Sequence, residues 1–212
     1  MTLLPLDPDE LLTTTRSVRK RLDLDRPVPL DLVKKCLAVA LQAPTGGNAQ
    51  TWHWIVVTDP ELRAQIGEFY RRSYNAYRAS RGTAGGSAEK QAATARVVTS
   101  ADWLADHMGE VPILVIACIS ASEDLPAENQ AGLWGSLLPA AWSYQLAARA
   151  RGLGTAWTTL HLPHEREAAQ ILGIPYEEVM QAALIPVAYT IGTEFRPGQR
   201  EPLERTVHWD IW

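Results

Sequence analysis

A short basic segment near the N-terminus has the residue types of an anion-binding site. Residues 16–21 read RSVRKR. Arginine presents planar N–H donors that match phosphate oxygens, and a serine hydroxyl adds a further donor. An extended or turned backbone would let Arg16, Ser17 and Arg19 converge on one anion. The alternative is a solvated charged segment that pairs with nearby aspartates, as most runs of charge do.

A glycine-containing loop has the residue types that recognise a flat heterocycle. Residues 43–52 read APTGGNAQTW. The two glycines permit a close approach of the backbone to a ligand. The amides of Asn48 and Gln50 both donate and accept hydrogen bonds, as the edge of a heterocycle requires. The alternative is a plain connector between a helix and a strand, in which these amides satisfy turn backbone.

Two further segments could carry binding groups. Residues 151–161 read RGLGTAWTTLH, and Trp157 stands where a dinucleotide-binding fingerprint needs its third glycine. His161 and His164 have the wrong spacing for a helical zinc motif and a proline lies between them, so we expect no metal. Residues 195–202 read FRPGQREP, which is either a stiff arm with two cationic side chains or a frayed tail.

No constellation for covalent catalysis is present in the sequence. There is no G-x-S-x-G segment, and the glycines around residue 85 are not followed by the lysine of a phosphate-binding loop. The sequence therefore predicts binding groups, and no nucleophile with an adjacent base.

Composition excludes several classes of protein. The 212 residues carry a net charge of −4, which disfavours a general nucleic-acid binder. No apolar run reaches the ~18 residues that a membrane span needs. The N-terminus lacks the basic region of a signal peptide, so none is expected. Cys36 and Cys118 are too few for a disulfide framework, which favours a reducing, cytoplasmic setting.

Hydrophobic periodicity predicts helices that surround a small sheet. Strands are expected at residues 52–58, 111–119 and 183–191, with a strand or extended loop at 155–160. Helices are expected at residues 9–15, from 29 to before 44, from 60 onward, at about 89–108, and at 127–151, 163–172 and 175–181. The order has no regular βαβ alternation, so the fold class is α+β. Residues 80–88 are rich in glycine and are expected to form a mobile loop or lid.

Four segments taken together resemble one family. In order and spacing, residues 16–23 (RSVRKRLD), 43–57 (APTGGNAQTWHWIVV), 152–160 (GLGTAWTTL) and 195–209 (FRPGQREPLERTVHW) resemble the flavin-dependent nitroreductases. The resemblance implies a small mixed, mainly antiparallel sheet surrounded by helices, in an intertwined homodimer. It also implies one domain over residues 1–212, whose C-terminal arm of about 193–212 embraces the partner subunit.

The resemblance implies FMN at the subunit interface and assigns residues to it. The phosphate and ribityl chain would be held by Arg16, Ser17, Arg19, Arg196 and Arg200. The ring would meet Pro44, Thr45, Gly46 and Asn48 of the other subunit. The reactive edge of the flavin would lie near Thr158, Thr159 and Leu160.

The resemblance also implies a reaction. Electrons would pass from NADPH or NADH through flavin N5 to a nitroaromatic, a quinone or a similar conjugated acceptor by a ping-pong mechanism, with no catalytic residue in the protein. Trp103, Trp134 and Trp157 are candidates to stack on a flat acceptor. The alternatives are a related flavoenzyme that dehalogenates, reduces enones or fragments flavin, and a non-catalytic FMN-binding protein.

Overall fold

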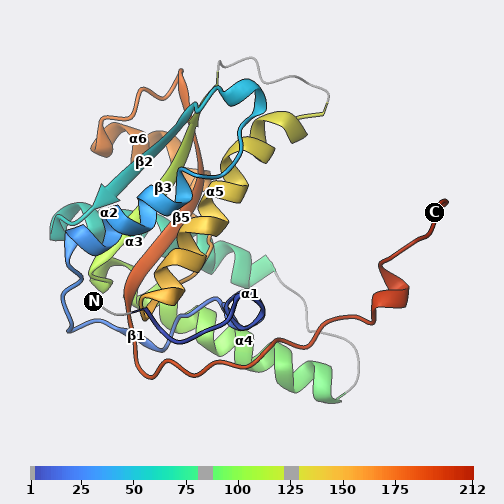
Figure 1. Cartoon of the computed structure of the whole chain (residues 1–212). Helices are drawn as coiled ribbons and strands as arrows, with labels where there is room; N and C mark the ends of the chain where they lie inside the picture. Colours follow the sequence, from blue (N-terminus) through green and yellow to red (C-terminus); the bar gives the residue numbers. More distant parts are fainter. Residues whose placement is uncertain (1–2, 81–87, 122–128) are drawn as a thin grey trace.

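A five-stranded antiparallel sheet forms the centre of the computed structural model, which describes residues 3–80, 88–121 and 129–212 (Figure 1). Its strands are β1 (Leu22–Asp23), β2 (Trp52–Val57), β3 (Ile113–Ser120), β4 (Leu153–Thr155) and β5 (Val179–Thr190). The order is β1-β5-β3-β2, and β4 also pairs with β5. Every pair among these strands is antiparallel, and the prediction of an α+β fold is confirmed.

Helices cover both faces of the sheet. They are α1 (Pro8–Thr14), α2 (Leu30–Ala40), α3 (Pro60–Ser80), α4 (Ala88–His107), α5 (Ala131–Ala150) and α6 (Glu165–Leu172). Alternate residues of β3 face two separate apolar clusters, one built with α2 and α5 and the other with α3, α4 and α6. This explains why the segment before residue 120 is apolar without alternation, as a strand covered on both faces must be.

One expectation is wrong, and another falls outside the described residues. The prediction of a helix over residues 175–181 is wrong, because residues 176–178 form a turn and β5 begins at Val179. Residues Val179–Gln181 pair with the end of β3, and this long-range pairing overrides the local preference for a helix. The predicted lid at 80–88 falls almost entirely on residues 81–87, which lie outside the described residues.

Helix α5 is apolar around most of its circumference. Leu137, Ala141 and Tyr144 face the core, whereas Leu138 and Trp142 on the other side are 36% and 39% exposed. A helix that is apolar on two faces needs a second partner surface. Within the described residues, no helix is both long and apolar enough to cross a membrane.

The basic segment lies directly against β4. The backbone N–H of Val18 donates to the carbonyl of Thr155 at 2.8 Å, and Ser17 forms a parallel bridge with Thr155. The side chains of Val18, within the basic segment, and of Leu22, directly after it, are buried. A Cβ atom on Gly154 would lie within 3.0 Å of the side chains of Val18, Leu22 and Thr190. The absence of a side chain at residue 154 therefore sets how closely the basic segment approaches the sheet.

We predict that Gly154→Ala lowers the free energy of unfolding by about 1–3 kcal/mol, because the added methyl group overpacks this contact. Gly135→Ala is the control, since a Cβ at this exposed helical position meets nothing within 4 Å and the change should be neutral or slightly stabilising. Urea unfolding followed by circular dichroism measures both. Equal stability of the two variants would contradict the close approach described for residue 154.

Candidate functional site

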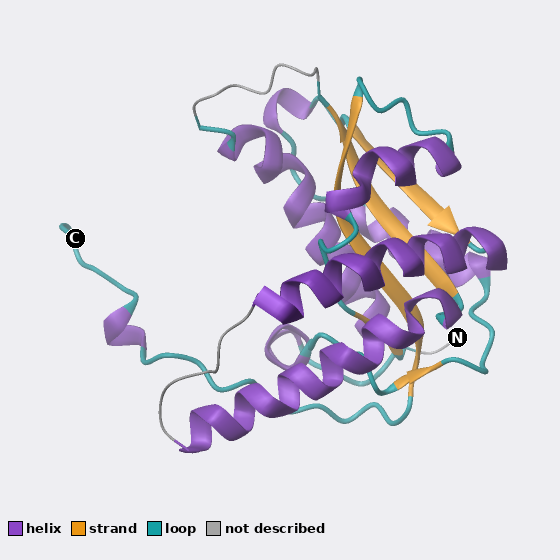
Figure 2. Cartoon of the chain, turned by 180° about the vertical axis from the view of Figure 1, so that it is seen from behind, coloured by secondary structure: helices purple, strands orange, loops and turns teal. Residues whose placement is uncertain are grey.

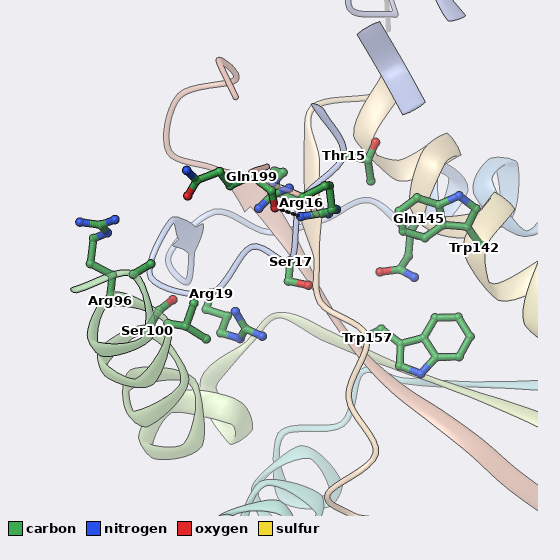
Figure 3. Close-up of a pocket in the computed structure, with 13 residues that line it drawn as sticks. Thr15, Arg16, Ser17, Arg19, Arg96, Ser100, Trp142, Gln145, Trp157 and Gln199 are labelled. Carbon is green, nitrogen blue, oxygen red and sulfur yellow. Dashed lines mark hydrogen bonds between the residues drawn. The ribbon is translucent and has the colours of Figure 1, made fainter. Parts of the chain in front are cut away.

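A pocket of about 790 Å³ opens between the basic segment, α4, α5 and the start of the C-terminal arm (Figure 3). It is lined by Thr15, Arg16, Ser17, Arg19, Ala93, Arg96, Val97, Ser100, Trp142, Gln145, Trp157, Gln199 and Arg200. The structure thus brings Arg16, Ser17, Arg19 and Arg200 to one cavity from opposite ends of the chain. Such a volume is in the range of pockets that hold cofactors.

The pocket has an unbalanced positive charge. Four arginines line it, and no aspartate or glutamate of the described part of the chain does. Among the described residues none of these four arginines forms an ion pair, whereas Arg71, Arg78 and Arg166 elsewhere on the surface pair with carboxylates. Arg200 Nη1 donates to the carbonyl of its neighbour Gln199. Guanidinium groups gathered in this way attract an anion.

The start of the arm is fastened to the body by Arg21. Its Nε donates to the carbonyl of Ile191 at 2.8 Å and its Nη2 to that of Gly192 at 2.7 Å. The guanidinium groups of Arg21 and Arg149 lie 4.2 Å and 4.8 Å from the centre of the Phe195 ring. These contacts direct the arm along the pocket of its own chain, so that Gln199 and Arg200 line it.

Gly198 and Arg196 occupy different positions on this part of the arm. A Cβ atom on Gly198 would collide with the guanidinium groups of Arg16 and Arg200. The backbone of the arm can therefore pass this close to the two arginines only because residue 198 has no side chain. Arg196 is exposed and does not line the pocket. The structure therefore brings only one of the two predicted arm arginines to the site.

The far end of the pocket is aromatic and contains an unsatisfied amide. Figure 3 places Trp142, Gln145 and Trp157 opposite Arg19 and Arg96. Gln145 is 3% exposed, its Oε1 accepts from Thr155 Oγ1 at 3.3 Å, and its Nε2 has no partner among the described residues. A buried donor without a partner costs free energy unless a ligand satisfies it.

Sequence reasoning missed Trp142 and Gln145 as site residues. A signal was present, because Gln145 is a lone amide in an otherwise apolar stretch of α5, AAWSYQLAA. Amides at such positions are buried only with hydrogen-bond partners, so an isolated one indicates a polar cavity or a ligand.

The glycine-containing loop lies away from the pocket of its own chain. Pro44, Gly46 and Asn48 are exposed, and Gly46 N donates to Ser136 Oγ at 3.1 Å, beside the first turns of α5. Asn48 and Gln50 have φ angles of 53° and 50°, in the left-handed region. Non-glycine residues held there store strain, and such residues cluster at functional sites.

The segment after β4 is hydrogen-bonded in part to strand β5. Thr158 N and Oγ1 both donate to the carbonyl of Leu184, at 3.1 Å and 2.7 Å, so both of its donors are used. Thr159 is exposed, and Leu160 packs against the core. None of the three lines the pocket; the neighbouring Trp157 does.

The other two candidate tryptophans contact neighbouring side chains outside the pocket. Trp103 stacks on His107 with ring centroids 4.5 Å apart, and Trp134 Nε1 donates to Gln130 Oε1 at 2.9 Å. Neither lines the pocket. Of the three tryptophans proposed to stack on an acceptor, the structure brings Trp157 alone to the cavity.

The two histidines of the H-x-x-H segment lie in different environments. His161 is fully buried, and burial lowers its pKa to about 4, partly opposed by Gln181 nearby. His164 is partly exposed, with Nδ1 3.0 Å from Glu167 Oε1. Within the part of the chain that the structure describes, no three ligating side chains gather in a group that could hold a metal ion.

Comparisons with known proteins identify the family of the chain. The chain matches the model of the nitroreductase family over residues 12–189. It is 32% identical over 224 residues to a protein named NADH dehydrogenase from Thermus thermophilus, with 98% of each chain covered.

Two solved structures have the same fold. One is an iodotyrosine deiodinase bound to FMN and 3-iodo-L-tyrosine, with a TM-score of 0.72, 22% identity, and 96% of this chain and 99% of that chain covered. The other is the FMN- and NADPH-dependent nitroreductase NfnB from sphigopyxis sp. strain HMH, with a TM-score of 0.71, 18% identity, and 98% and 100% covered. Because the family model spans most of the chain, the protein belongs to the nitroreductase family.

Proposed function

We propose that the protein is an FMN-dependent oxidoreductase that passes electrons from NADPH or NADH to a conjugated acceptor such as a nitroaromatic or a quinone. One observation carries the proposal: a single pocket has unpaired arginines at one end and two tryptophans with an unsatisfied amide at the other. FMN combines a phosphate with a flat heterocycle, so its two ends match the two ends of the pocket. Family membership supports the same conclusion.

The residues present fit this cofactor. Arg16, Arg19 and Arg200 would hold the phosphate through charge-assisted hydrogen bonds, and Ser17 would donate a further one. Gln145 Nε2 would satisfy its unmet hydrogen bond on a carbonyl or hydroxyl oxygen of the cofactor. Trp142 and Trp157 would border the apolar part of the ligand.

The contribution of the protein is binding and orientation. When bound, FMN supplies the hydride and electron chemistry. The pocket-lining residues that the structure describes include no histidine, carboxylate or thiol, so none of them is suited to transfer a proton near neutral pH. We therefore infer that the chain acts by fixing the position of the cofactor, by its positive field and by the shape of the cavity.

A second copy of the chain would complete the site. The loop with Pro44, Thr45, Gly46 and Asn48 lies away from its own pocket, as it must if it serves the pocket of a partner. Beyond Arg200 the arm leaves the body in both views of the molecule (Figures 1 and 2). Trp209, Ile211 and Trp212 on it are 82%, 81% and 99% exposed. Large apolar side chains this exposed indicate a protein interface.

The visible spectrum of the purified protein tests the proposed function. We expect a yellow protein, or a colourless one that becomes yellow with added FMN, whose colour bleaches when NADPH or NADH is added without oxygen. An acceptor such as a nitroaromatic or a quinone should then restore the colour. A protein that ignores added FMN would falsify the proposal, and one that binds FMN but is never reduced would be a binding protein instead.

We predict that Arg19→Ala weakens FMN binding by about 1–3 kcal/mol, because one charge-assisted hydrogen bond to the phosphate is lost. Quenching of flavin fluorescence during titration of the FMN-free protein measures the dissociation constant. Arg166→Ala is the control, since Arg166 is exposed and pairs with Glu177 far from the pocket lining. Identical affinities of the two variants would count against the phosphate assignment.

We predict that a chain ending at residue 200 no longer forms a stable dimer, because residues 201–212 carry the exposed tryptophans that would cover the partner. Light scattering of the full and shortened proteins at equal concentration measures the mass in solution. A shortened chain that remains a flavin-loaded dimer would show that the arm has another role.

A further inference from the structure

One face of α4 is turned toward the pocket and not toward the core. Ala93, Arg96, Val97 and Ser100 line the cavity, and their spacing of three, four and seven residues places them on one side of the helix. The buried positions of α4 come later, at Leu104 and Ala105. Figure 2 shows the first half of α4 reaching beyond the sheet, and none of these four residues belongs to either of the two described apolar clusters.

Arg96 is the charged residue of that face and has no ion pair among the described residues. Arg78 on the neighbouring α3 illustrates the contrast, because its Nε lies 3.0 Å from Asp102 Oδ1. Figure 3 places Arg96 at the α4 side of the pocket with Ser100 and Arg19, opposite Trp157. A guanidinium and a hydroxyl one helical turn apart form a pair of donors suited to an oxyanion.

The phosphate of FMN does not require this fourth cation. A phosphate monoester carries about two negative charges near pH 7. Arg16, Arg19 and Arg200 already supply three positive charges around it under the proposed function. Arg96 comes from a different element and leaves an excess of positive charge, which a second anion would balance.

We propose that Arg96 and Ser100 form a second anion subsite, which binds an oxyanion of the co-substrate that enters after FMN. The inference rests on the proposed function and deepens it by naming the chemistry of the co-substrate. The oxyanion is a carboxylate on an aromatic acceptor or the 2′-phosphate of NADPH. Ala93 and Val97 beside the arginine provide an apolar surface for the ring that carries the anion.

Binding of unreactive ligands to the oxidised, FMN-loaded protein tests the subsite. The flavin absorbance is followed during titration with 4-hydroxybenzoate and with its neutral amide, and separately with NADP⁺ and NAD⁺. We expect Arg96→Gln to weaken binding of 4-hydroxybenzoate, or of NADP⁺, by about tenfold or more and to leave its uncharged counterpart within about twofold. Arg96→Lys should restore most of the loss, because a positive charge remains.

Controls keep the two proposals separate. Arg72→Gln removes an exposed arginine that faces Glu167 at 3.8 Å and should change none of these affinities. FMN affinity is measured for every variant. If Arg96→Gln weakens FMN as much as Arg19→Ala does, Arg96 belongs to the phosphate site and the second subsite is disproved. If neither anion loses affinity, it is disproved as well, whereas FMN binding stands. A protein that takes up no FMN overturns both proposals.

Discussion

Repulsion between arginine side chains that share one pocket is the constraint on which the site depends. Arg16, Arg19, Arg96 and Arg200 each bring a guanidinium group to this pocket. Within residues 3–80, 88–121 and 129–212, no carboxylate lines the pocket to offset them. The fold must hold like charges together, and a bound anion would relieve the repulsion and stabilise the folded state. The cluster of like charges would therefore both destabilise the free protein and favour the binding of an anion.

The scaffold that holds these charges is built from the two ends of the chain. Three residues of the basic segment have different tasks: Val18 is buried on β4, Arg19 faces the pocket, and Arg21 binds the arm. The carbonyl of Arg21 also accepts from Ile191 N at 2.8 Å, so one residue joins both ends on its backbone and its side chain. Close packing at Gly154 sets the distance between the basic segment and the sheet.

The sequence was informative where the signal was local. The apolar run of β3 and the long apolar stretch of α5 predicted a strand and a helix at these places from their own residues. The strand start at Val179 was missed because it depends on pairing with β3. Arg96 and Gln145 were missed because their role depends on how α4 and α5 flank one cavity, which no local pattern encodes. Of the four predicted segments, the loop at residues 43–52 lies apart from the pocket of its own chain, and its residues were predicted to serve the other subunit.

Under the proposed function, the positive charge in the pocket would bear on electron transfer as well as on ligand choice. Electron transfer into a bound group adds negative charge to it, and fixed positive charge nearby stabilises that state. The charged side chains that the described lining offers for this are arginines. Under the proposed function, the arginine-rich lining would favour both the arrival of an anionic ligand and its reduction, so one arrangement of charge would serve binding and chemistry.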